Sequence, residues 1–297
     1  MTARAKSVLI LVSAIAVTAI VSSVATRYGL ERSTPGLRHG SFESKSLGED
    51  RTFLVYLPDS YTDPDAADRR YPVIYALDGS SQADHTHSSA AMMARLGLMP
   101  EVIVVGIPNV SREGRARDYT PPEMREDPDD AGSPLGRADT FLAFLRDELI
   151  PHVERHYRTA PSRLLTGHSR GGLFVVYSLI AAPGLFDARF AYSAPVWRQD
   201  ALLVQRLEAA LPAAPPLRGE LFVSVGERET DRMKAGFERL VGALEKHAPA
   251  SLRWRAELTP RADHGNNSPR STPAGLRHAF AQWAPAPVLR LARGNYS

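Results

Sequence analysis

Residues 163–182 read Arg163-Leu-Leu-Thr-Gly167-His168-Ser169-Arg170-Gly171-Gly172-Leu-Phe-Val-Val-Tyr-Ser-Leu-Ile-Ala-Ala182. The stretch places a G-x-S-x-G pentapeptide between an apolar, strand-like run and a helix-like run. A serine hydroxyl becomes a good nucleophile only when its Oγ is held out of the backbone, next to a base and beside amide donors. A sharp strand-to-helix turn meets these needs, and the flanking glycines allow it. The stretch therefore predicts Ser169 as a nucleophile, with a structural glycine-rich turn as the alternative.

Length, charge and cysteine content restrict the class of protein. The chain has 297 residues, a formal net charge of +3 and no cysteine. It is long enough to bury a sizeable core in one large α/β domain or in two small domains. Without cysteine there is no disulfide framework, no thiolate metal site and no lipoprotein anchor. No basic tract is present, so we expect no nucleic-acid partner.

The first 29 residues indicate export. A short basic start precedes the uncharged, mostly apolar run Ser7–Val24, and Ser23-Val24-Ala25 offers small residues suited to signal peptidase. The run is long for a signal-peptide core and just long enough to span a bilayer. Residues 1–29 are therefore either a cleaved signal peptide or a retained membrane anchor. Both alternatives place residues 30–297 in the periplasm or outside the cell, with membrane contact only through the N-terminal segment, and they leave the oligomeric state open.

Strand-like and helix-like segments alternate through residues 30–297. Strands are expected at 52–57, 71–77, 102–107, 163–166, 190–193, 221–225 and 252–258. Helices are expected at 89–98, 141–157, 171–182, 233–246 and 273–283. Continuous apolar strands are typical of a sheet covered on both faces. The alternation predicts a single α/β domain with a mostly parallel, doubly wound sheet.

The polar segment 111–136 interrupts this alternation. It is rich in Arg, Asp, Glu and Pro and has no apolar periodicity. A loop of this length inside a compact domain is usually functional or disordered. We expect a lid or substrate-binding loop, and the alternative is a solvated insertion.

The base and the acid are expected in the loops after the last two strands, because loops at the carboxyl ends of parallel strands meet in one crevice. His264 would take the Ser169 proton and return it to the leaving alkoxide, although it could also be a surface-loop histidine. For the acid we favour Glu229, with Glu227 as the next choice. The order Ser…Glu…His is the order of an α/β-hydrolase triad.

Two backbone amides are expected to stabilise the oxyanion. One belongs to Arg170, the residue after the nucleophile. The other is the amide of Ser80, in the turn Asp78-Gly79-Ser80-Ser81 after the strand at 71–77, and the alternative is an ordinary Asp-Gly turn. His168 is the neighbour of the nucleophile, and we expect the strained turn to point its ring elsewhere.

No metal and no other cofactor is expected. The histidine pairs at 85 and 87 and at 152 and 156 lack a suitably placed third ligand, and there is no H-E-x-x-H motif. Trp197 is expected near the crevice, where it would either stack on an aromatic acyl group or pack in the core. Arg170, Arg115 and Arg117 would either bind an anionic acyl group or face solvent.

With these residues placed, the chain resembles the esterase family of α/β hydrolases, which includes the enterobactin and salmochelin esterases and esterase-D-like enzymes. The resemblance covers about Thr52 to Trp283. Its motifs are Val55-Tyr-Leu-Pro58, Tyr75-Ala-Leu-Asp-Gly79, Val105-Gly-Ile-Pro-Asn109, Arg117-Asp-Tyr-Thr-Pro121, Glu148-Leu-Ile-Pro151, Gly167-His-Ser-Arg-Gly-Gly172 and His264-Gly265. It implies an α/β-hydrolase fold and ester hydrolysis without a cofactor, and it matches Ser169 and His264 to the nucleophile and base.

Two features limit what the resemblance implies. Relatives often show Ser-Pro-Ser-x-Trp-Trp where this chain reads Ser193-Ala-Pro-Val-Trp197, with a single tryptophan. Some siderophore esterases work with a Ser–His pair, which leaves the acid open. We expect an exported serine esterase that hydrolyses a small-molecule carboxylic ester through an acyl-enzyme, with the trilactone of a siderophore as one candidate. The alternatives are an acyltransferase of the mycolyltransferase type and a non-catalytic binding module on a hydrolase fold.

Overall fold

The computed structural model describes residues 36–127, 131–213 and 216–283. The expected export segment 1–29 lies outside the described residues. From Arg38 onward the described residues belong to one compact unit. Within these ranges, no helix has both the length and the apolar character needed to cross a membrane.

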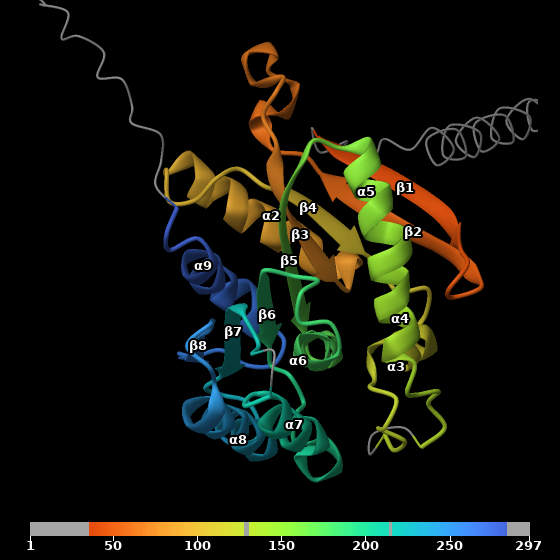
Figure 1. Cartoon of the computed structure of the whole chain (residues 1–297), viewed down its shortest axis with the longest axis vertical. Coiled ribbons are helices and arrows are strands. Elements are labelled where there is room, and N and C mark those ends of the chain that lie inside the picture. The colour runs from red at the N-terminus through yellow and green to blue at the C-terminus, as the bar shows by residue number, and fades with distance from the viewer. Residues whose placement is uncertain (1–35, 128–130, 214–215, 284–297) are drawn as a thin grey trace, which may run out of the picture. The chain divides into compact units, whose positions relative to one another are not determined.

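The described strands form one eight-stranded sheet in the order β1-β2-β4-β3-β5-β6-β7-β8 (Figure 1). β2 pairs antiparallel with β4. Every neighbouring pair in the spatial series β4-β3-β5-β6-β7-β8 is parallel. The strands are β1 (Leu37–Ser44), β2 (Glu49–Tyr56), β3 (Tyr71–Leu77), β4 (Ile103–Ile107), β5 (Thr159–His168), β6 (Ala188–Tyr192), β7 (Gly219–Gly226) and β8 (Leu252–Thr259). The predicted α/β class with a mostly parallel, doubly wound sheet is confirmed.

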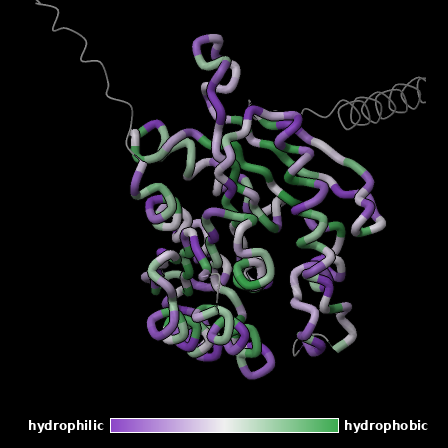
Figure 2. Tube along the Cα trace, viewed as in Figure 1, coloured by the Kyte–Doolittle hydropathy of each residue, from purple (hydrophilic) through white to green (hydrophobic). Residues whose placement is uncertain are grey.

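Helices cover both faces of this sheet. α2 and α9 pack against each other on one face, and α6 lies beside α4 and α7 on the other (Figure 1). The helices are α2 (Gly79–Arg95), α3 (Arg112–Tyr119), α4 (Ala138–Phe144), α5 (Ile150–His156), α6 (Arg170–Ala181), α7 (Arg198–Ala210), α8 (Asp231–His247) and α9 (Asn267–Ala279). A π-helical turn, η3 (Leu145–Leu149), joins α4 to α5, and two short 3-10 turns, η1 (Asp59–Thr62) and η2 (Pro64–Ala66), precede β3. Figure 2 shows the hydrophobic residues concentrated in the central strands.

The structure contains elements that the apolar pattern did not predict. β1, α3 and α7 were not expected, and α2 begins at Gly79 instead of residue 89. The segment 111–136 is therefore not simply a loop, because its first part forms α3. This helix is highly polar, and its start is fixed by a cap in which the Ser111 hydroxyl accepts the Gly114 N–H at 2.9 Å. α2 begins with small residues such as Gly79 and Ala83, which pack on the sheet without giving an apolar signal.

The turn between β5 and α6 is tight enough to require glycine. A Cβ on Gly167 would lie 2.5 Å from the carbonyl carbon of Gly171, and a Cβ on Gly172 would lie 2.9 Å from the Tyr192 carbonyl oxygen. Between them Ser169 adopts φ 55° and ψ −122°, a conformation that costs free energy in a residue with a side chain. The turn places Ser169 at the carboxyl end of the sheet and at the start of α6.

Candidate active site

Three loops at the carboxyl ends of β5, β7 and β8 bring Ser169, Glu229 and His264 together. Ser169 Oγ lies 3.0 Å from His264 Nε2, and His264 Nδ1 lies 2.8 Å from Glu229 Oε2. The His264 side chain is 49% exposed, whereas that of Glu229 is 1% exposed. Glu227 points elsewhere, because its exposed carboxylate accepts the Arg261 N–H at 2.6 Å. The structure thus forms one hydrogen-bonded chain of hydroxyl, imidazole and carboxylate.

The second oxygen of Glu229 is held by other buried groups. Its Oε1 accepts the Ser193 hydroxyl at 2.5 Å and the Gly226 N–H at 3.0 Å. Ser193 Oγ in turn accepts the Asn267 side-chain amide at 2.8 Å. Burial raises the pKa of the Glu229 carboxyl, but the hydrogen bonds from His264, Ser193 and Gly226 outweigh it, so the pKa lies below its ordinary value. The carboxylate is therefore ionised and fixed at neutral pH.

Ser193 and Asn267 are supporting residues that were not predicted from the sequence. Both are buried, and Ser193 adopts a φ of 49°, which is unusual for a residue other than glycine. The sequence does carry a usable signal, because Ser193 opens the Ser-Ala-Pro-Val-Trp segment, which corresponds to the Ser-Pro-Ser-x-Trp-Trp pattern of relatives.

The two predicted oxyanion donors lie at the starts of helices. Arg170 is the first residue of α6 and Ser80 the second of α2, where backbone N–H groups have no partner within the helix. Arg170 and Ser169 line a hollow of about 510 Å³. Ser80 lines a neighbouring hollow of about 360 Å³, and Arg115 lines both. The residue before the α2 turn, Asp78, has a φ of 55°.

The hollow that contains Ser169 is lined by many charged side chains. Its arginines are Arg112, Arg115, Arg170, Arg198, Arg228 and Arg232, and its carboxylates are Glu113, Asp127, Glu229 and Asp263. The segment 111–136 contributes to this wall through α3 and through Asp127, which is paired with both Arg170 and Arg198. Arginine side chains therefore outnumber carboxylates in the lining of the hollow around the nucleophile.

Trp197 also lines this hollow. The Arg232 guanidinium lies 4.4 Å from the centre of its ring, and its indole N–H points at Met233 Sδ, 3.0 Å away. A flat, cation-covered ring at this position can contact an aromatic or apolar part of a substrate.

The structure does not bring Arg117 to the hollow. Its guanidinium pairs with Glu49 and Asp118, each at 2.7 Å, and Arg117 is not among the residues that line the space around Ser169. The expectation that it contacts an acyl group is therefore withdrawn. The segment brings Arg115 to the hollow instead.

The two histidine pairs weighed as metal sites have other partners. His85 contacts Gln82 and Ser268 through its Nε2, and the His152 ring stacks on Phe42 and on His156. In the parts of the chain that the structure describes, no group of three or more His, Asp or Glu side chains is arranged to hold a metal ion.

His168 lies beside the base instead of pointing away from it. The centres of the His168 and His264 rings are 4.7 Å apart. Burial, followed by the neighbouring His264, lowers the pKa of His168 to about 4 from the ordinary value of 6.5. His168 is therefore neutral at pH 7, and protonating it would place a cation next to the catalytic imidazole.

This depressed pKa predicts a loss of stability in weak acid. The pKa of His168 is lower in the folded than in the unfolded state. The folded protein therefore keeps its full stability with respect to this group above about pH 6.5, and it loses stability as the pH falls toward 4. Lowering the pH from 7 to 5 should reduce the free energy of unfolding by about 1–2 kcal/mol through His168. Urea unfolding at both pH values should show a smaller loss in His168→Gln than in the wild type. His39→Gln, at an exposed position on β1, should lose as much as the wild type, and an equal loss in all three would contradict the prediction.

Comparison with known proteins identifies the family. The model of the family described as "Putative esterase" matches residues 44–286. The chain belongs to this esterase family. The sequence resemblance is thereby confirmed, as is the α/β-hydrolase fold.

Among its relatives, the ferri-bacillibactin esterase BesA of Bacillus subtilis (strain 168) is 34% identical over 173 residues, which are 53% of this chain and 59% of BesA. The siderophore enterobactin esterase of Emericella nidulans is 32% identical over 154 residues, 45% of this chain and 49% of that protein. The matches thus span less than two thirds of these relatives. An IroE-like serine hydrolase from Shewanella oneidensis has a similar structure, with a TM-score of 0.75, 30% identity and coverage of 84% of this chain and 81% of that one. Family and relatives support ester hydrolysis as the class of reaction.

Proposed function

We propose that this protein is an exported serine esterase that hydrolyses a carboxylic ester through an acyl-enzyme. The observation that carries the proposal is the hydrogen-bonded chain from Ser169 through His264 to Glu229, at 3.0 and 2.8 Å. The first distance suits proton transfer from the nucleophile to its base, and the second suits a hydrogen bond from the base to the carboxylate that orients it. Export rests on the character of residues 1–29.

The proposed reaction proceeds in two halves. Ser169 Oγ attacks the ester carbonyl carbon while His264 Nε2 accepts the hydroxyl proton, and the carbonyl oxygen becomes an oxyanion between the amides of Arg170 and Ser80. When the oxyanion collapses, the bond to the alcohol oxygen breaks, and His264 donates its proton to that leaving group. Water then attacks the acyl carbon while His264 accepts a proton from it. When this second oxyanion collapses, the bond to Ser169 Oγ breaks, His264 returns the proton to Oγ, and the acid is released. Glu229 keeps the imidazole in the tautomer with its proton on Nδ1 and stabilises its charged form.

A siderophore lactone is the proposed class of substrate. The relatives named above are esterases of bacillibactin and enterobactin by name. The predominance of arginine around Ser169, with Trp197 on the same wall, suits an acyl group that carries both an aromatic ring and negative charge.

Labelling of the full chain with a fluorophosphonate tests the reaction class. The wild type should be labelled, Ser169→Ala should not, and His264→Ala should be labelled far more slowly. Ser88→Ala, at an exposed position on α2, is the matched control and should be labelled like the wild type. If the folded wild type is not labelled, the esterase proposal is wrong and a binding function must be tested. If it is labelled but transfers its acyl group to an added alcohol in preference to water, it is an acyltransferase.

A further inference from the structure

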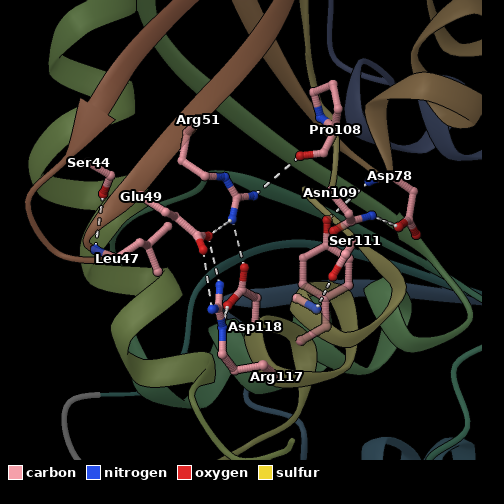
Figure 3. Close-up of polar contacts among 12 residues, drawn as sticks. Ser44, Leu47, Glu49, Arg51, Asp78, Pro108, Asn109, Ser111, Arg117 and Asp118 are labelled. Atoms are coloured by element: carbon pink, nitrogen blue, oxygen red, sulfur yellow. Dashed lines mark hydrogen bonds and ion pairs between the residues drawn. The ribbon is translucent and has the colours of Figure 1, made fainter. Parts of the chain in front are cut away.

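The carboxylate of Asp78 is almost fully enclosed by polar partners, and the proposed reaction does not use it. Asp78 follows β3 directly, and its side chain is 10% exposed. The Arg115 guanidinium donates to both carboxylate oxygens, from Nε at 2.6 Å and from Nη2 at 2.8 Å. The Asn109 side-chain amide donates to Oδ1 at 2.5 Å, a contact drawn in Figure 3. The Asp78 backbone N–H donates to the Tyr119 hydroxyl at 3.2 Å. A carboxylate with this many partners fixes the backbone that carries it.

Arg115 also contacts the second turn of the site. Its Nη2 donates to the carbonyl oxygen of His168, the residue before the nucleophile, at 3.3 Å. The Asp78 carboxylate itself lies close to the start of α6, because a Cβ on Gly171 would be 3.2 Å from Asp78 Oδ2. The pair of Arg115 and Asp78 therefore bridges the turn after β3 and the turn after β5. These turns carry the amides of Ser80 and Arg170.

The helix that supplies Arg115 is itself firmly anchored. Asp118 on α3 faces Arg51 on β2 (Figure 3). Their charged groups lie 2.8 Å apart, and their side chains are 1% and 0% exposed. Arg117 on the same helix binds Glu49 on β2. The Tyr119 ring is fully buried against Phe141 and Phe174. Because α3 is fixed to both β2 and the core, Arg115 reaches the two turns from a rigid base.

We propose that Arg115 is a positioning residue that sets the distance between the two oxyanion-hole amides. The inference rests on the proposed function. A guanidinium suits this task because its planar, bidentate contact with Asp78 fixes both distance and direction, which a lysine ammonium does not. Oxyanion donors act only when they point at the place where the charge develops, so a displaced donor is lost in the transition state and not in substrate binding.

A different role for Arg115 makes the opposite prediction. Arg115 also lines the hollow around Ser169, so it could instead bind an anionic group of the substrate. Removing such a contact would raise KM for an anionic ester and leave a neutral ester unaffected. A neutral substrate therefore separates the two roles.

The test compares Arg115→Ala and Arg115→Lys with the wild type on 4-nitrophenyl acetate, a small neutral ester. We expect kcat to fall by about 30- to 100-fold in Arg115→Ala with little change in KM. The inhibition constant of phenylboronic acid, which forms a tetrahedral adduct with an active serine, should rise by a similar factor. Arg115→Lys should recover only part of kcat, and guanidinium ion added at a non-denaturing concentration should partly restore Arg115→Ala.

Arg95→Ala is the matched control. It removes an exposed arginine that contacts Asp59 through two nitrogens, at 2.8 and 2.7 Å, at the other end of α2, and it should leave both constants unchanged. If Arg115→Ala fails to fold, Asp78→Asn, which keeps the shape of the side chain but removes its charge, gives the same test. An unchanged kcat, a rise in KM alone, or a lower kcat without weaker boronic acid binding would overturn the inference. Failure of the proposed function would look different, because the wild type would then neither be labelled nor hydrolyse the ester.

Discussion

Replacing His264 with alanine should reduce kcat/KM for 4-nitrophenyl acetate by about 10⁴- to 10⁶-fold, the range seen when the base of a serine hydrolase is removed. Without the imidazole, no other side chain among the described residues is hydrogen-bonded to Ser169 Oγ to accept its proton as it attacks. The side chain is about half exposed, so its loss leaves no buried cavity, but it removes a hydrogen-bond partner of the buried Glu229 carboxylate. Thermal unfolding should therefore shift to a modestly lower temperature.

A double variant checks whether His264 and Ser169 act as one unit. In Ser169→Ala/His264→Ala the loss of kcat/KM should equal the loss in either single variant. Each substitution alone already stops the same step. Steady-state kinetics on all three proteins gives the answer. Additive losses would show that the two side chains contribute independently, which contradicts a nucleophile–base pair.

Replacing Glu229 with glutamine should lower kcat by about 10²- to 10⁴-fold with a small effect on KM. A glutamine amide that donates to His264 would select the wrong imidazole tautomer, and it would not stabilise the imidazolium. Glu227→Gln is the matched control, since this exposed carboxylate contacts the backbone of Arg261, and it should keep nearly full activity. Activity in Glu229→Gln close to that of the wild type would indicate that Ser169 and His264 suffice as a pair.

The same variant should alter how stability depends on pH. Hydrogen bonds hold the pKa of Glu229 below its ordinary value despite its burial. Its stabilisation is therefore complete above the unfolded value near 4.5 and is lost as the pH falls through the lower folded value. The difference in melting temperature between the wild type and Glu229→Gln should shrink in that acidic range. A difference that stays constant down to pH 3 would contradict this assignment.

The sheet and the elbow could be predicted because each depends on local sequence. Continuous apolar runs such as Tyr71–Leu77 can satisfy their burial only inside a covered sheet, and that strand was predicted with its exact bounds. The glycines around Ser169 require a close crossing of strand and helix, which the distances at Gly167 show directly. Chain order then limited the positions available to a base and an acid.

The hydrogen bonds and ion pairs that hold the candidate site in place could not be predicted from the sequence, because they join residues that are distant along the chain. Arg115 meets Asp78 across 37 positions, and Ser193 meets Glu229 across 36. Charged residues in a polar segment look the same whether they are solvated or paired. α3 has no apolar stripe and is held by ion pairs instead, so a search for apolar periodicity could not find it.

The arginines around Ser169 would also affect the approach of a charged substrate before any contact is made. Six arginines and four carboxylates line that hollow, and Asp78 offsets Arg115. The remaining small excess of arginine would favour the approach of an anionic ester over that of a neutral one. This electrostatic preference would weaken as salt is added. Screening shortens the range over which charges act from about 30 Å at 0.01 M ionic strength to about 8 Å at 0.15 M. The preference of this protein for charged over neutral esters would then depend on the ionic strength of its surroundings as well as on the shape of the hollow.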